Sequence, residues 1–177
     1  DPYHNVKYDP FWEVCEDLGV IVHFHSGPAP HAEYFGAGFP VEDKRDELPG
    51  AMGIYVSEVM WWLYRPLTFM IWGGVFERFP RLKVMIVEGG TMFMLPPWLR
   101  LMDFHYSEGQ ISAKLGNFRE HLSLSPGEYY QRNVGIGASC VLRPDIDMRD
   151  DIGLDKIMWG SDYPHPEGSW PNTGQYL

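Results

Sequence analysis

The sequence predicts an α/β fold built around a parallel sheet, and three observations support this. Short apolar runs alternate with helical patterns, an order typical of parallel strands joined by crossover helices. Three of these runs end alike, in an ionisable residue followed by a turn. Glycine and proline contribute 19 and 15 of the 177 residues, which is too many for a helical bundle and typical of many short connections. This length suits a single domain, residues 1–177.

Three strands are predicted at the apolar runs Val20–His25, Val84–Glu88 and Ile157–Asp162. Their nearly continuous apolar character is expected of parallel strands that are buried on both faces. A weaker fourth strand is predicted at Asn133–Ser139, where two glycines interrupt the pattern.

Helical patterns lie between these strands. Asp9 and Pro10 suit the N-cap and the first helical position, and an apolar stripe follows them as far as Gly19. From Ile54 to Phe79 we expect helix that is interrupted at Pro66. Two more helices are expected, one from Pro96-Pro97 to about Tyr106 and one opened by the capping-box pattern Ser125-Pro126-Gly127-Glu128.

Four strand–helix units amount to about half of a (β/α)8 barrel, which usually needs about 250 residues. A doubly wound sheet is the alternative. In both folds ligands bind at the carboxyl ends of the strands, where His25, Glu88 and Asp162 stand. The chain begins at Asp1 without a methionine and stops soon after its richest motif, so we expect it to be part of a longer polypeptide.

Composition excludes several classes of function. The net charge of −10, from 14 Lys and Arg against 24 Asp and Glu, would repel DNA or RNA. No apolar stretch reaches the roughly 18 residues of a membrane span, and no signal peptide is recognisable. Cys15 and Cys140 form no disulfide framework, so a cytoplasmic location is expected and both are interpreted as small buried side chains.

Two segments carry the residue types of a metal site. His23-Phe24-His25 places two imidazoles on one face of a strand, and imidazole is a good zinc ligand. His25, at the strand end, is the candidate ligand, whereas His23 is interpreted as a hydrogen-bonded core histidine. His31 could reach the same mouth from the following loop, while His4, His105 and His121 are expected at the surface.

The segment Trp159–Gly168 is the most specific in the chain. A carboxylate at a buried strand end, such as Asp162, is costly unless it is hydrogen-bonded or neutralised by a cation. It can bind a metal and also accept a proton. His165 stands between two prolines beside it, and Glu88 precedes two glycines where a ligand can approach. The alternatives are an Asp162 that only caps backbone amides, a structural His165, and a Glu88 paired with an arginine.

Five segments together resemble the amidohydrolase-related family, in particular the branch of aminocarboxymuconate semialdehyde and resorcylate-type decarboxylases. They are Tyr8–Trp12, His25-Ser26-Gly27, Gly74–Lys83, Glu88-Gly89-Gly90 and Gly160–Gly168. The resemblance covers nearly the whole chain and implies about the C-terminal half of a metal-dependent (β/α)8 barrel. It also implies that His25 and Asp162 bind the metal and that Asp162 acts as acid or base. The family's first-strand His-x-His pair is missing, and many relatives carry a histidine where this sequence has Glu88.

The leading hypothesis is therefore a metal-dependent hydrolase or non-oxidative decarboxylase of a small carboxylated or cyclic organic molecule. His25 and Asp162 are the predicted metal ligands, and Asp162, Glu88 and His165 are the predicted catalytic residues. Zinc is the expected ion, with manganese as the alternative. The rival hypothesis is a non-catalytic half-barrel that serves binding or assembly. Because a half-barrel exposes apolar faces, we also expect a homo-oligomer.

Overall fold

The structure is a computed structural model, and it describes residues 2–25, 50–89, 92–108, 116–138, 140–166 and 168–176. Its four-stranded sheet is parallel throughout, with the strands side by side in chain order. The strands are β1 (Ile21–His25), β2 (Lys83–Val87), β3 (Val134–Ala138) and β4 (Ile157–Trp159). The predicted parallel α/β sheet is confirmed, and the main difference is that β4 ends before Asp162.

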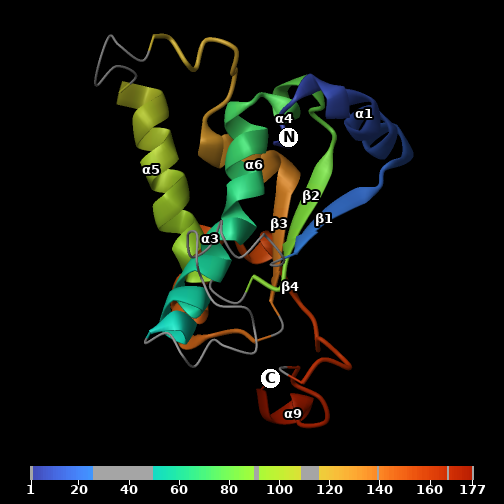
Figure 1. The fold of residues 1–177 in the computed structure, drawn as a ribbon, viewed down its shortest axis with the longest axis vertical. Coiled ribbons are helices and arrows are strands. Elements are labelled where there is room, and N and C mark those ends of the chain that lie inside the picture. Colours follow the sequence, from blue (N-terminus) through green and yellow to red (C-terminus); the bar gives the residue numbers. More distant parts are fainter. Residues whose placement is uncertain are drawn as a thin grey trace.

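Helices connect the strands, and three of them, α3, α5 and α6, lie together at the left of the sheet in Figure 1, with α6 in contact with the other two. The helices are η1 (Val6–Tyr8), α1 (Asp9–Leu18), α3 (Ala51–Trp72), α4 (Val75–Arg78), η3 (Met92–Met94), α5 (Leu95–Glu108), α6 (Pro126–Asn133), α7 (Arg143–Asp147), α8 (Arg149–Ile152), η5 (Leu154–Lys156) and α9 (Thr173–Tyr176). In the part of the chain that the structure describes, none of these helices combines the length and apolar character that crossing a membrane requires.

The two faces of the sheet differ in how they are covered. Alternate side chains point toward the helices and form the buried core of the sheet: Phe24, Val84, Ile86, Val134 and Ile136. On the opposite face His23 is exposed, and Met158 is 45% exposed. Met85 of β2, on the same face, is buried, so this open face is exposed only at the outer strands β1 and β4. Parallel sheets are usually covered on both faces.

Two predictions about individual side chains are wrong. His23 is not a core histidine, because it lies on the open face of the sheet. Cys15 is buried as predicted, but Cys140 is exposed, since it follows β3 outside the core. His31 lies outside the described residues.

The predicted interruption at Pro66 is also wrong, because α3 continues through this residue. A proline inside a helix costs about 3 kcal/mol, but the fully buried Leu63, Leu67 and Met70 on either side of it hold the helix in place. Burial of each such side chain contributes about 1.5–3 kcal/mol. The helix ends instead at Gly73, and Gly74 turns the chain into α4 with a φ of 69°.

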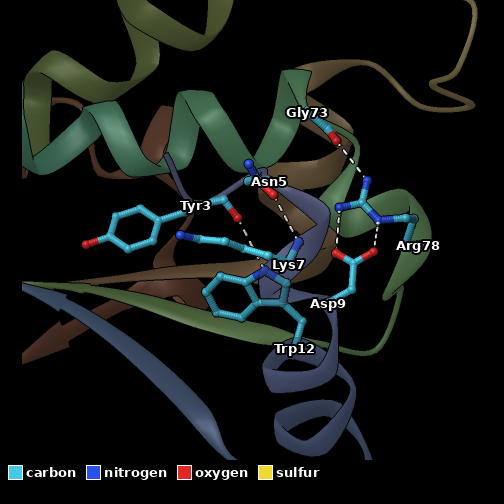
Figure 2. Close-up of polar contacts among 7 residues, drawn as sticks. All are labelled: Tyr3, Asn5, Lys7, Asp9, Trp12, Gly73 and Arg78. Atoms are coloured by element: carbon cyan, nitrogen blue, oxygen red, sulfur yellow. Dashed lines mark hydrogen bonds and ion pairs between the residues drawn. The ribbon is translucent and has the colours of Figure 1, made fainter. Parts of the chain in front are cut away.

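Asp9 does not act as the predicted N-cap of α1. Tyr8 occupies the cap position and Asp9 is the first helical residue. Its two carboxylate oxygens instead accept hydrogen bonds from Nε and a terminal nitrogen of Arg78, at 2.9 and 2.8 Å. Figure 2 shows that the same guanidinium also donates to the Gly73 carbonyl, at 2.9 Å, so Arg78 ties α1 to the turn between α3 and α4. The helix ends at Gly19, as predicted.

Glu77 of α4 joins that helix to the segment before α6. Its carboxylate accepts hydrogen bonds from the Tyr129 hydroxyl and from the backbone nitrogen and hydroxyl of Ser123. The bond from Tyr129 is the main reason that the pKa of Glu77 lies below its ordinary value of 4.5. Ser125 begins α6 with the predicted capping box to Glu128.

We expect Glu77→Gln to lower the free energy of unfolding by about 1–2 kcal/mol at pH 7. Because the folded pKa is lowered, the carboxylate stabilises the fold above pH 4.5, and this contribution disappears as the pH falls through the folded pKa. Urea unfolding from pH 7 to pH 3 should therefore show the two proteins converging in acid. Glu58→Gln, at an exposed position, is the control. Parallel stability curves for the parent and Glu77→Gln would contradict the prediction.

Candidate metal centre

The carboxyl ends of the parallel strands bring the predicted site residues to one edge of the sheet. His25 is the last residue of β1, and Glu88 directly follows β2. Asp162 comes three residues after the end of β4. The register places His25 beside Val87, and the Gly160 nitrogen donates to the Ala138 carbonyl at 3.1 Å. The carboxyl ends of β1, β2 and β4 therefore place these three polar side chains at a common mouth.

Four predicted side chains meet there in two contacts. His25 Nε2 lies 2.7 Å from Glu88 Oε2, and His165 Nδ1 lies 3.3 Å from Asp162 Oδ2. One potential ligand atom each from Glu88, Asp162 and His165 lies within 4.8 Å of the others. Among the described residues, the ion-pair contact of Glu88 is with His25.

One carboxylate oxygen of Asp162 is buried without a hydrogen-bond donor among the described residues. This oxygen, Oδ2, has no such donor even though His165 is near. A buried carboxylate oxygen is costly unless it is hydrogen-bonded or neutralised. The predicted alternative, in which the carboxylate only caps backbone amides, leaves this oxygen unexplained. The residues present thus fit a cation at this point.

The backbone at both carboxylates is unusual. Glu88 and Asp162 each have a φ of 56°, in the left-handed region. This conformation costs a residue other than glycine about 1–2 kcal/mol, and such residues cluster at functional sites. The left-handed turn comes immediately after β2 at Glu88 and shortly after β4 at Asp162, so it keeps both carboxylates at the mouth.

A tight turn holds Asp162 and His165 together. The His165 nitrogen donates to the Asp162 carbonyl at 2.7 Å, and the Ser169 nitrogen donates to the Ser161 carbonyl at 3.0 Å. The turn leaves no room for a side chain at Gly168, because a Cβ there would lie 2.5 Å from the Ser161 carbonyl oxygen. The role of Gly168 was not recognised in the sequence, although its place at the end of the motif is a usable signal.

A pocket of about 210 Å³ opens at this mouth and is lined by His25, Val87, Glu88, Gly137, Ala138, Met158, Trp159, Gly160 and Asp162. The pocket is smaller than the roughly 300 Å³ at which pockets for drug-sized ligands begin. Its polar side chains come from three strand ends, and its walls are apolar. This arrangement suits an ion together with a small molecule.

A further carboxylate, Asp145, was missed in the sequence. It is 1% exposed, and its two oxygens accept hydrogen bonds from the backbone nitrogens of Phe93 and Leu142, both at 2.8 Å. It therefore ties together the segments that follow β2 and β3. The available signal was Pro144-Asp145 at the start of α7, where an acidic residue commonly caps a helix.

Comparison with known proteins supplies the family. The family model described as amidohydrolase matches residues 1–177. The chain belongs to the amidohydrolase family. The family-level resemblance and the (β/α)8 class predicted from the sequence are thus confirmed, with four parallel strands of this amidohydrolase observed here.

Solved structures agree with this fold. An amidohydrolase from Mycobacterium avium subsp. paratuberculosis has a TM-score of 0.70 and 24% identity, over 94% of this chain and 38% of that one. The 5-carboxyvanillate decarboxylase of Sphingomonas paucimobilis gives 0.61 and 24%, over 93% and 45%. A dihydroxybenzoic acid decarboxylase from Polaromonas, with bound manganese and the inhibitor 2-nitroresorcinol, gives 0.59 and 23%, over 92% and 45%. The chain spans less than half the length of these three proteins.

Proposed function

We propose that this amidohydrolase is a divalent-metal-dependent enzyme that hydrolyses or decarboxylates a small carboxylated or cyclic organic molecule. The observation that carries the proposal is the buried Oδ2 of Asp162, which accepts no hydrogen bond from the described residues and lies within a cluster of metal-ligating side chains. The decarboxylases of similar fold, both named for carboxylated aromatic substrates, support the decarboxylation arm by analogy.

Asp162 and His25 would hold the ion, as the resemblance implies. When bound, such an ion polarises a substrate oxygen or lowers the pKa of a water ligand to about 7. His165, 3.3 Å from Asp162, is placed to take up or release a proton beside the ligand carboxylate. The apolar pocket walls, including Val87 and Met158, would contact the apolar part of the reacting molecule. Zinc, expected from the sequence, and manganese, bound in the Polaromonas structure, are the two candidate ions.

The test is the amount of metal bound per chain. The apoprotein is incubated with excess Mn²⁺ or Zn²⁺ and desalted, and the bound metal is measured by mass spectrometry. We expect about one ion per chain in the parent and in the control Asp150→Asn, an exposed carboxylate on α8. His25→Ala should bind clearly less, and Asp162→Asn should retain less than about a tenth. A parent that binds no ion, or an Asp162→Asn variant that binds normally, would overturn the proposal.

The rival function is an assembly module without a complete metal site. The open face of the sheet, with exposed His23 and Met158, favours it, because parallel sheets are usually covered on both faces. Self-association through this face would give the homo-oligomer expected from the sequence. Metal content and light scattering together separate the two functions: a metal-loaded chain supports the enzyme whatever its oligomeric state, and a metal-free oligomer supports the module.

A further inference from the structure

Glu88 belongs to the cluster of potential metal ligands at the mouth. Glu88 contributes one of the three potential ligand atoms that lie within 4.8 Å of one another, with Asp162 and His165 supplying the others. Its side chain is 22% exposed, close to the 25% of Asp162. Glu88 is therefore part of the cluster itself and does not stand at its outer edge.

The contact with His25 does not prevent Glu88 from binding an ion. His25 Nε2 approaches Oε2 of the carboxylate at 2.7 Å. A carboxylate has two oxygens and about four acceptor positions, so it can hold an imidazole and a cation together. Hydrogen-bonded partners of this kind commonly orient metal ligands.

The charges of Glu88 and Asp162 also favour a cation at this point. Potential ligand atoms of Glu88 and Asp162 lie within 4.8 Å of each other, so two carboxylates converge on one point of the mouth. The described residues that line the pocket include neither lysine nor arginine. A divalent cation between the two carboxylates would be attracted by both.

We infer that Glu88 binds the divalent cation directly, beside Asp162, and that it shifts the metal selectivity of the site toward Mn²⁺ relative to Zn²⁺. The inference rests on the proposed function, because it concerns the same ion. It gives Glu88 a metal-binding role in place of the catalytic role that the sequence predicts. Carboxylate oxygens suit Mn²⁺ and Mg²⁺, whereas imidazole suits Zn²⁺. Zn²⁺ binds most sites more tightly than Mn²⁺, so the ratio of the two affinities is the informative quantity.

The experiment measures metal binding without any substrate. Mn²⁺ binding to the apoprotein is followed by the loss of the EPR signal of free Mn²⁺, and Zn²⁺ affinity is obtained by competition. Glu88→Gln should weaken Mn²⁺ binding at least about tenfold. Glu88→His should raise the ratio of Zn²⁺ to Mn²⁺ affinity by about tenfold or more. Glu13→Gln and Glu13→His, at an exposed position on α1, should behave like the parent.

Other outcomes separate this inference from the proposed function. Thermal unfolding first establishes that the Glu88 variants fold. If folded Glu88→Gln binds Mn²⁺ as tightly as the parent while Asp162→Asn does not bind, the inference is overturned and the proposed function stands. If Glu88→His leaves the affinity ratio unchanged, the selectivity role is overturned. If the parent binds neither ion, both proposals fail.

Discussion

Replacing Asp145 by alanine is expected to lower the free energy of unfolding by about 3 kcal/mol or more, the largest stability effect that we predict. The carboxylate is 1% exposed, and each of its oxygens accepts a backbone hydrogen bond, from Phe93 and from Leu142. Alanine leaves both partly buried donors without this acceptor, and each unsatisfied group costs about 1–3 kcal/mol. Denaturant unfolding at pH 7 measures the difference.

Two companion variants make this result specific. Asp145→Asn keeps one oxygen acceptor of the same shape, so we expect a loss between those of the parent and the alanine variant. Asp147→Ala removes a neighbouring carboxylate on the same short helix, which only forms an exposed ion pair with Arg143. That change should cost less than about 0.5 kcal/mol. Equal stabilities of Asp145→Ala and Asp147→Ala would show that the buried carboxylate does not hold the two segments together.

Gly168→Ala is expected to reduce metal affinity by about tenfold or more while the sheet remains folded. A Cβ at this position would lie 2.5 Å from the Ser161 carbonyl oxygen and 3.0 Å from those of Asp162 and His165. All three neighbours are backbone atoms, so the turn has to open rather than repack. Opening separates Asp162 from His165, and small displacements of positioned groups are costly to a site. Bound Mn²⁺ after desalting, with circular dichroism for the fold, measures both effects.

Gly174→Ala is the matched control for this variant. A Cβ at Gly174, in α9, meets nothing within 4 Å, so neither the metal affinity nor the fold should change. Normal metal binding by Gly168→Ala would mean that the turn from Ser161 to Ser169 can open without disturbing the ion. The turn would then be ruled out as the element that positions Asp162.

The sequence by itself determined where the strands lie and the edge of the sheet that holds the site. Each apolar run formed a parallel strand, and Phe24, Val84, Ile86 and Ile136 are buried against the helices, as expected of such runs. Parallel strands bring their carboxyl ends to one edge, so His25, Glu88 and Asp162 had to come near one another. The local capping pattern at Ser125 was equally sufficient to place the start of α6.

Only the tertiary structure decided which of these groups touch. Local pattern placed Asp9 at a cap, but Arg78, 69 positions along the chain, forms two bonds to its carboxylate. Pro66 stays inside a helix because long-range burial outweighs a local cost. The contact of His25 with Glu88 likewise depends on the register of two strands, which short-range preferences do not specify. Such contacts join residues far apart in sequence, and no local spacing encodes them, so the geometry of the site emerges only when the whole sheet is packed.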